Sequence, residues 1–216
     1  KHSSEILQAN KNLEKCFGSI LDEEFVEKAC KDVDAVVHLA GLAHVSKPTK
    51  DELYRTNVHG TEILLAAAIE GKAKRFVFMS SSLATIANSG KPANTVYSRT
   101  KRAAEESIMK HHQEGSIECV VLRPVNVYGC GMQGNIATLI LAVSKRLAPP
   151  LPRLQTLISL VGVDDVCEAT RLAIISENAC GKIYTLTDGI QYDISDIERA
   201  IYQQVGRTPP TWQTPR

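Results

Sequence analysis

The stretch Ala35-Val36-Val37-His38-Leu39-Ala40-Gly41 decides the fold of this 216-residue chain. Its first six residues form a short apolar run, which predicts a strand buried on both faces. Similar runs recur at residues 75–79 and 118–122, and a further strand is predicted at residues 182–186. Apolar strands separated by helices are typical of a parallel sheet with right-handed crossovers. The predicted class is therefore α/β, with a doubly wound parallel sheet.

Helices are predicted between the strands and after them. The segments with helical patterning lie at residues 23–30, 51–70, 96–112, 136–145, 163–176 and 194–205. Asp193 or Ser195 would cap the last of these helices. The proline-rich Ala148-Pro149-Pro150-Leu151-Pro152 is the nearest approach to a linker.

The composition disfavours several classes of protein. With 44% hydrophobic and 23% charged residues, the chain suits one globular domain with a sizeable core and room for a small appendage. The formal net charge of +1 gives no field typical of nucleic-acid binding. No apolar run is long enough to span a membrane, and Lys1-His2-Ser3-Ser4-Glu5 does not resemble a signal peptide. We therefore expect a cytoplasmic protein without nucleic-acid or membrane partners.

The cysteines disfavour a metal site and a disulfide framework. They are scattered and form no C-x-x-C pair, whereas both kinds of site need closer or patterned spacing. Several lie in apolar runs, which is typical of buried thiols in a reducing compartment. The six are Cys16, Cys30, Cys119, Cys130, Cys167 and Cys180.

Ligands of open parallel sheets bind outside the carboxyl ends of the strands, so the residues after each strand are the candidates for a site. Ala40-Gly41 follows the first strand and is small enough for a ligand to approach the backbone closely. Ser80-Ser81-Ser82 follows the second strand, and a segment containing Asn126 follows the third. Three strand ends therefore supply a glycine, hydroxyls and an amide at one edge of the sheet.

Tyr97 and Lys101 stand four residues apart at the start of the predicted helix 96–112. Positions i and i+4 share a helix face, so the ammonium of Lys101 can lie near the phenol of Tyr97. A fixed cation favours the phenolate form, which is otherwise scarce at neutral pH because a phenol titrates near 10. The pair therefore predicts proton exchange between Tyr97 and a substrate hydroxyl.

Seven short motifs follow one another in the chain. They are Phe17-Gly18-Ser19-Ile20-Leu21-Asp22, His38-Leu39-Ala40-Gly41, Asn57-Val58-His59-Gly60-Thr61, Phe76-Val77-Phe78-Met79-Ser80-Ser81, the Tyr97/Lys101 pair, Leu122-Arg123-Pro124-Val125-Asn126-Val127-Tyr128-Gly129, and Leu160-Val161-Gly162-Val163-Asp164-Asp165-Val166. In this order they resemble the extended short-chain dehydrogenase/reductase family, specifically its nucleotide-sugar epimerase/dehydratase branch. The resemblance implies a Rossmann-like fold with a small C-terminal substrate-binding portion.

The resemblance implies a role for each residue of the site. Tyr97 would be the general acid/base on a sugar hydroxyl, and Lys101 would bind the nicotinamide ribose and lower the pKa of Tyr97. Ser81 would hydrogen-bond the reacting oxygen, with Ser82 as the neighbouring alternative. A UDP-hexose 4-epimerase of this kind oxidises C4 transiently by hydride transfer to NAD and returns the hydride on the other face.

The remaining contacts are also implied by the resemblance. Asn126 would touch a substrate diphosphate, although a turn residue that bonds its own backbone fits the sequence equally. Asn57 would be structural, and His38 is expected to pack in the sheet. The cofactor would be NAD, with NADP not excluded, and its contacts would be Ser19, Ile20, Leu39, Ala40, Gly41, Tyr97, Lys101 and Pro124.

One departure from the family pattern concerns the start of the chain. A dinucleotide-binding unit begins with a strand, a glycine-rich turn and a helix. No glycine cluster precedes Phe17, and Lys1–Lys15 is too short for a β-α-β unit. We expect that this first unit is absent from the chain, either because the chain is a fragment, which we favour, or because the protein is degenerate. The expected partial Rossmann domain is residues 1–130 with segments near 155–190, and residues 131–155 and 187–216 form the substrate portion.

Further departures bear on the substrate. Ser19 stands where an acidic residue is expected, and the interval from Ser81 to Tyr97 is short for the family. Ile158 stands where sugar-nucleotide enzymes of this branch usually carry a phosphate-binding arginine, although Arg153 lies nearby.

Three functions remain open at this stage. An NAD-dependent nucleotide-sugar epimerase leads, and an NAD(P)-dependent reductase of the same fold on a non-sugar substrate follows. A dehydratase is disfavoured, because Ser82 and Leu83 stand where that activity usually places an acid pair. A catalytically silent dinucleotide-sensing protein has no need for Tyr97 and Lys101. A homodimer is expected, paired through the helices at residues 51–70 and 96–112.

Overall fold

The computed structural model describes residues 12–43, 48–85, 95–132, 134–147 and 157–209. Its main sheet has four strands in the order β1-β2-β3-β6, and every neighbouring pair is parallel. The strands are β1 (Ala35–His38), β2 (Arg75–Met79), β3 (Glu118–Pro124) and β6 (Lys182–Leu186). The predicted α/β class with a parallel sheet is thereby confirmed.

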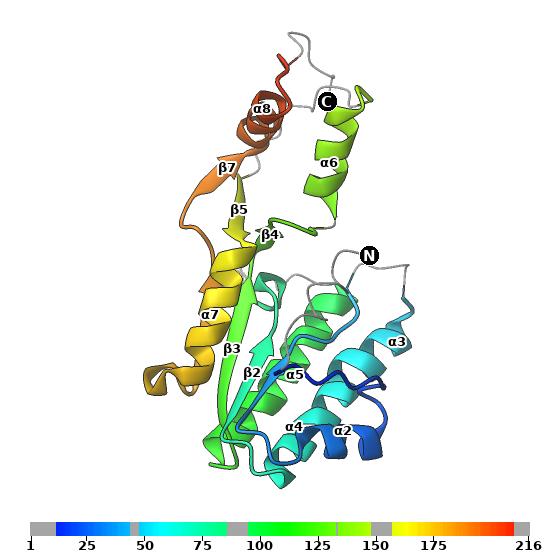
Figure 1. The fold of residues 1–216 in the computed structure, drawn as a ribbon, viewed down its shortest axis with the longest axis vertical. Coiled ribbons are helices and arrows are strands. Elements are labelled where there is room, and N and C mark those ends of the chain that lie inside the picture. Colours follow the sequence, from blue (N-terminus) through cyan, green and yellow to red (C-terminus); the bar gives the residue numbers. More distant parts are fainter. Residues whose placement is uncertain (1–11, 44–47, 86–94, 133, 148–156, 210–216) are drawn as a thin grey trace.

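Helices cover both faces of this sheet (Figure 1). The helices α2 (Glu23–Cys30), α4 (Gly60–Glu70) and α5 (Val96–Gln113) lie on one side, and α7 (Val163–Ile175) lies on the other. Alternate residues of β2 pack into the apolar clusters on opposite faces of the sheet. Phe76 and Phe78 pack with α4 and α5, whereas Val77 packs with Ala173 of α7. This double burial is the physical reason that the strands are continuously apolar.

The predicted helix 51–70 is interrupted in the structure. A short helix α3 (Lys50–Tyr54) starts at Thr49, which forms a capping box with Glu52. The π-helical turn η1 (Arg55–His59) follows it and leads directly into α4. Such single turns often occur at functional sites, and this one carries the buried Asn57.

A second, smaller sheet has the strand order β4-β5-β7, with α6 and α8 beside it (Figure 1). Its elements are β4 (Asn126–Tyr128), β5 (Leu157–Gly162), β7 (Gln191–Asp193), α6 (Asn135–Ser144) and α8 (Ile194–Gln204). Val143, Ile197, Ile201 and Tyr202 form its core. Of the two expected caps, Asp193 fills the position, since its carboxylate accepts from the Ser195 N–H at 2.8 Å.

The small sheet differs from the sequence-based expectation in two ways. None of its three strands was predicted, because two of them are only three residues long and leave no periodic pattern. β4 and β5 pair with each other in this sheet, although residues 126–130 and the segment from 155 were assigned to the Rossmann domain. The domain boundaries stay a proposal, and the proline-rich stretch lies outside the described residues.

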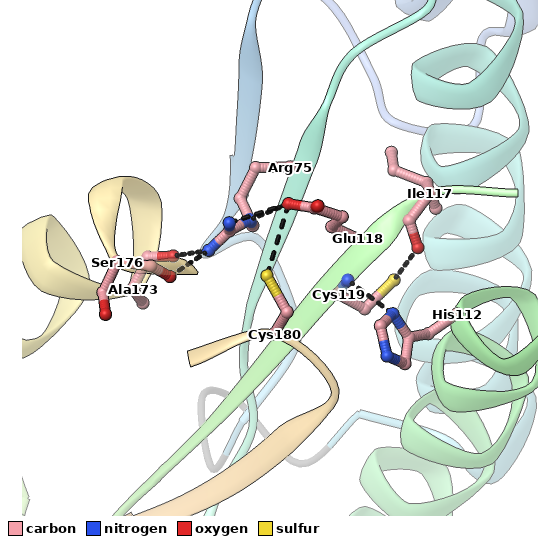
Figure 2. A network of polar contacts seen from close by, with 8 residues as sticks. All are labelled: Arg75, His112, Ile117, Glu118, Cys119, Ala173, Ser176 and Cys180. Carbon is pink, nitrogen blue, oxygen red and sulfur yellow. Dashed lines mark hydrogen bonds and ion pairs between the residues drawn. The ribbon is translucent and has the colours of Figure 1, made fainter. Parts of the chain in front are cut away.

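Buried Arg75 ties the amino end of the main sheet together (Figure 2). Its guanidinium donates to Glu118 Oε2 from Nε at 3.2 Å and from Nη2 at 2.7 Å. Its Nη1 donates to the carbonyls of Ala173 and Ser176 at 2.7 and 3.0 Å, which satisfies the carboxyl end of α7. The thiol of Cys180 donates to the same carboxylate at 3.3 Å. One side chain thus joins two strands to the helix on the far face.

The described part of the chain has neither a membrane-spanning helix nor a cluster of metal ligands. Among its residues, no helix has the length and apolar character needed to cross a membrane. The same residues contain no group of three histidine, cysteine or carboxylate side chains able to hold a metal ion. All six cysteines are free thiols. Cys119 is buried in β3, as its apolar run predicted, and Cys30 is buried at the end of α2, whereas Cys16, Cys130 and Cys167 are exposed.

Candidate active site

The candidate site lies at the carboxyl end of the main sheet, where β1, β2 and β3 end beside the first turns of α5. The Thr95 hydroxyl starts α5 by accepting from the Ser98 N–H at 3.1 Å. Tyr97 and Lys101 follow in the first two turns, on the face that packs against the end of β2. The convergence predicted from the sequence is therefore present for β1, β2 and α5.

Tyr97 is paired with Ser81. The Ser81 side chain hydrogen-bonds the phenol, and the Ser81 Oγ also accepts from the Leu83 N–H at 3.2 Å. That second bond starts the short 3-10 turn η2 (Ser82–Ala84), which holds the serine at the strand end. Burial raises the pKa of Tyr97, and the Ser81 hydrogen bond opposes that rise. Ser81, preferred over Ser82 as the residue that contacts the reacting oxygen, is the serine that lies beside Tyr97, and its role stays a prediction.

Lys101 is held beneath this pair. Its residue is 5% exposed, its Nζ donates to the Met79 carbonyl at 2.9 Å, and the ammonium lies 4.6 Å from the centroid of the Phe78 ring. Burial lowers the pKa of Lys101 to about 8, and the carboxylate of Glu105 opposes that fall.

One expectation about this pair is corrected. Lys101 was expected to lower the pKa of Tyr97, but that pKa is raised. Burial of the phenol is the largest cause of that rise, and the Ser81 hydrogen bond, not the charge of Lys101, is the contact that opposes it.

The end of β1 passes directly over Lys101. A Cβ added to Gly41 would lie 3.4 Å from Lys101 Nζ and 3.2 Å from Asn57 Oδ1, so a larger residue would push into both. Leu39 is 63% exposed, and Ala40 and Gly41 are also exposed. The strand end thus presents an open, small-residue surface beside the buried ammonium.

Asn57 fixes the loop that follows this surface. Its Oδ1 accepts from the Leu42 N–H at 2.7 Å, and its Nδ2 donates to the Leu42 carbonyl at 2.9 Å and to Thr100 Oγ1 at 3.1 Å. These bonds join the π-helical turn, the β1 loop and α5. The structural role expected for Asn57 is confirmed.

His38 is buried in the sheet, as expected, and takes part in the same network. Thr61 Oγ1 donates to the Asn57 carbonyl at 2.8 Å and lies 2.9 Å from His38 Nε2. Because the threonine proton is used, His38 Nε2 must be the donor to Thr61. Burial and the nearby charge of Lys101 lower the pKa of His38 to about 4, so the imidazole is neutral at pH 7.

The other residues expected to contact a cofactor lie at different places. Ser19 is exposed, and its Oγ accepts from the Leu21 N–H at 3.2 Å. Ile20 packs against α4, where a Cβ on Gly60 would lie 2.6 Å from its Cδ1. Pro124 is buried at the end of β3, opposite Leu186 of β6.

Asn126 lies in the small sheet, and Ser82 lies in η2. Asn126 is exposed, and its Nδ2 donates to the Ser159 carbonyl at 3.1 Å, so it bonds β5 and not a turn of its own. Ile158 of β5 packs against the apolar core of the small sheet. Arg153, the alternative phosphate ligand, lies outside the described residues.

One buried polar residue next to the site, Glu105, was missed by the sequence reasoning. The Glu105 carboxylate is 3% exposed and accepts from Arg123 and Ser80. Its spacing could have indicated it, because Glu105 follows Lys101 by four residues and therefore lies on the same face of the helix. Arg123 is partly buried, and its guanidinium forms an ion pair with this carboxylate.

The chain matches a known protein family. Residues 2–186 match the model of the NAD dependent epimerase/dehydratase family. The chain is 31% identical to a UDP-glucose 4-epimerase of Vibrio cholerae over 204 residues, which cover 88% of the chain and 62% of that protein. It is 28% identical to 4-hydroxy-2-methyl-3-oxo-4-farnesyl-3,4-dihydroquinoline-1-oxide ketoreductase of Stigmatella aurantiaca, over 89% of the chain and 62% of that protein.

A solved structure shows the same fold. A double mutant of dTDP-glucose 4,6-dehydratase from Streptomyces venezuelae, solved with NAD bound, has a TM-score of 0.82 to this structure at 21% identity. The match covers 94% of this chain and 67% of that one. The chain thus spans about two thirds of the length of these similar proteins.

Proposed function

The chain belongs to the NAD-dependent epimerase/dehydratase family, and on this premise we propose that it acts as an NAD-dependent 4-epimerase of a UDP-hexose. The observation that carries the proposal is the hydrogen bond between Tyr97 and Ser81 above the buried ammonium of Lys101. The similarity to the UDP-glucose 4-epimerase of Vibrio cholerae supports the choice of reaction within the family.

The residues at the end of β1 fit the nicotinamide end of a dinucleotide. Leu39, Ala40 and Gly41 are exposed, and Gly41 leaves room beside Lys101 that a Cβ would occupy. Lys101 would bind the ribose, and Ser19 and Ile20 would lie toward the adenine. A bound NAD would accept a hydride from C4 of the sugar and return it, so that no net oxidation occurs.

The chain's own residues would move the proton. Tyr97 takes the proton of the C4 hydroxyl on its phenolate oxygen as the C4 carbonyl forms, and it gives that proton back to the C4 oxygen in the second half of the reaction. Before substrate binds, the Ser81 hydroxyl donates its single proton to Tyr97, which opposes the rise in the Tyr97 pKa caused by burial. With substrate bound, that proton would be donated to the C4 oxygen instead and would stabilise the charge that develops there.

A reductase acting on a non-sugar ketone is the second candidate. Its supporting observation is Ile158, whose side chain belongs to an apolar core at the position where a phosphate-binding arginine was expected. The similarity to a ketoreductase at 28% identity points the same way. Asn126, exposed on β4, supports the epimerase instead, since its amide nitrogen has a second proton for a diphosphate besides the one that bonds Ser159.

The deciding experiment incubates the full-length protein with NAD and UDP-glucose, and in a second series with UDP-N-acetylglucosamine. Proton NMR of the anomeric region then reports the C4 epimer, and Tyr97→Phe is the matched inactive control. Appearance of the epimer supports the proposal. Consumption of NADPH with simple ketones, without any epimer, would replace it by the reductase, and inactivity in both assays would reject both.

A further inference from the structure

Helix α5 carries a third buried polar side chain in line with Tyr97 and Lys101. Glu105 follows Lys101 by four residues, so all three side chains lie on one face of the helix. Only 3% of Glu105 is exposed. A buried carboxylate is costly unless it is paired and hydrogen-bonded, so its partners indicate what it holds in place.

The partners of Glu105 come from two neighbouring strands. Arg123 of β3 donates from Nε to Oε1 at 2.9 Å and from Nη2 to Oε2, which makes the pair bidentate. Ser80, just after β2, donates from its hydroxyl to Oε1. The Ser80 N–H also donates to the Leu122 carbonyl at 2.7 Å, which continues the pairing of β2 with β3. A bidentate ion pair fixes direction as well as distance, so the carboxylate holds both strand ends against α5.

Each of the three residues at the end of β2 makes one hydrogen bond to this face of α5. The Met79 carbonyl accepts from Lys101, the Ser80 hydroxyl donates to Glu105, and the Ser81 side chain hydrogen-bonds Tyr97. Three consecutive residues of the strand end therefore contact three successive turns of α5. A shift of the middle contact moves the two flanking contacts, because the backbone between them is continuous.

We infer that Glu105 is a positioning residue for the proton-transfer pair: it anchors Ser80 and Arg123 so that Ser81 meets Tyr97, and it places a negative charge on the helix face that carries Lys101. This inference rests on the proposed function, since it assigns Tyr97, Ser81 and Lys101 to the chemistry. Glu105 itself does not touch a reacting atom and acts through its two neighbours on the helix.

The charged and titratable groups around Lys101 agree with this role. Glu105 acts on it from its own helix, His38 faces it from β1, and Tyr97 shares its helix face by the four-residue spacing. Arg123 of β3 is directed at Glu105, which it pairs. Burial is the main cause of the lowered Lys101 pKa of about 8, and the Glu105 carboxylate is the group that opposes it.

The test is the titration of Lys101 in Glu105→Gln, followed by heteronuclear NMR of labelled lysine side chains and assigned with Lys101→Met. Glutamine keeps the size and an acceptor for Ser80 but removes the charge. We expect the Lys101 pKa to fall by roughly one unit or more, since an opposite charge at close range has been lost. Glu106→Gln is the matched control, because Glu106 is the exposed next residue of the same helix. A Lys101 titration equal in wild type and Glu105→Gln would overturn the electrostatic part of the inference.

Ser80→Ala tests whether Glu105 positions the end of β2, and it can also be measured if Glu105→Gln does not fold. It keeps the carboxylate and its charge but removes the bond that fixes the strand end. We expect the Tyr97 pKa, followed with ring-labelled tyrosine, to rise because the Ser81 hydrogen bond weakens, and kcat to fall roughly tenfold or more. An unchanged Tyr97 titration would overturn this part. Both titrations need no turnover, so expected shifts in a protein that does not epimerise UDP-glucose would reject only the proposed function.

Discussion

Removing the Lys101 ammonium should stabilise the protein at neutral pH, at the expense of the site. The ammonium is almost fully buried, and its pKa is about 8 where an ordinary lysine has 10.5. A difference of about 2.5 units, at about 1.36 kcal/mol per unit, means that the charged form costs on the order of 3 kcal/mol in the folded state. Lys101→Met removes that cost but leaves the Met79 carbonyl without a donor, which costs about 1 kcal/mol.

The difference in stability between the wild type and Lys101→Met should depend on pH. Below pH 8 the lysine is protonated in both the folded and the unfolded states, and the cost is present in full. Between about pH 8 and 10.5 the unfolded chain binds more protons than the folded one, so the wild type gains stability as the pH rises. The methionine variant has no such gain. Its advantage of about 2 kcal/mol at pH 7 should therefore shrink and vanish as the pH approaches 10.

Urea unfolding at pH 7, 8, 9 and 9.5 measures this difference between the two proteins. Lys110→Met is the matched control, because Lys110 lies on the same helix with its side chain 71% exposed and has little desolvation to relieve. A variant less stable than the wild type at pH 7, or a difference that stays constant from pH 7 to 9.5, would refute the reasoning.

Three other outcomes are expected. Tyr97→Phe should abolish epimerisation and leave NAD binding by calorimetry intact, because only the exchangeable proton is lost; retained turnover would remove Tyr97 from the chemistry. Arg75→Met should lower the free energy of unfolding by about 3 kcal/mol, because the carbonyls of Ala173 and Ser176 and the Glu118 carboxylate lose their donor. Glu118→Gln should lower it by less than about 1 kcal/mol, because the Glu118 side chain is 55% exposed. Equal losses of stability for the two variants in urea unfolding would contradict this. We expect a homodimer through residues 51–70 and 96–112, and a clean monomer by light scattering after size exclusion of the full-length protein would exclude it.

The main sheet was predictable because its two central strands, β2 and β3, are apolar on both faces. The runs at β2 and β3 pack against helices on each side, so their sequences carry no competing solvent-facing pattern. The break at residues 55–59 was not predictable, because a π-helical turn is decided by where the Asn57 amide finds partners in the β1 loop and α5. The strands of the small sheet were missed for a similar reason: three-residue strands exist only through their partners.

The sequence by itself predicted which side chains meet at the candidate site. The spacing of Tyr97 and Lys101 fixes them on one helix face, and the order of strands and helices brings Ser81 to the same edge of the sheet. Only the tertiary structure decided their electrostatic state. Burial depends on what packs around a group and not on its neighbours in the chain, so the raised pKa of Tyr97, the lowered pKa of Lys101 and the contact of Glu105 with β2 and β3 follow from the folded arrangement alone.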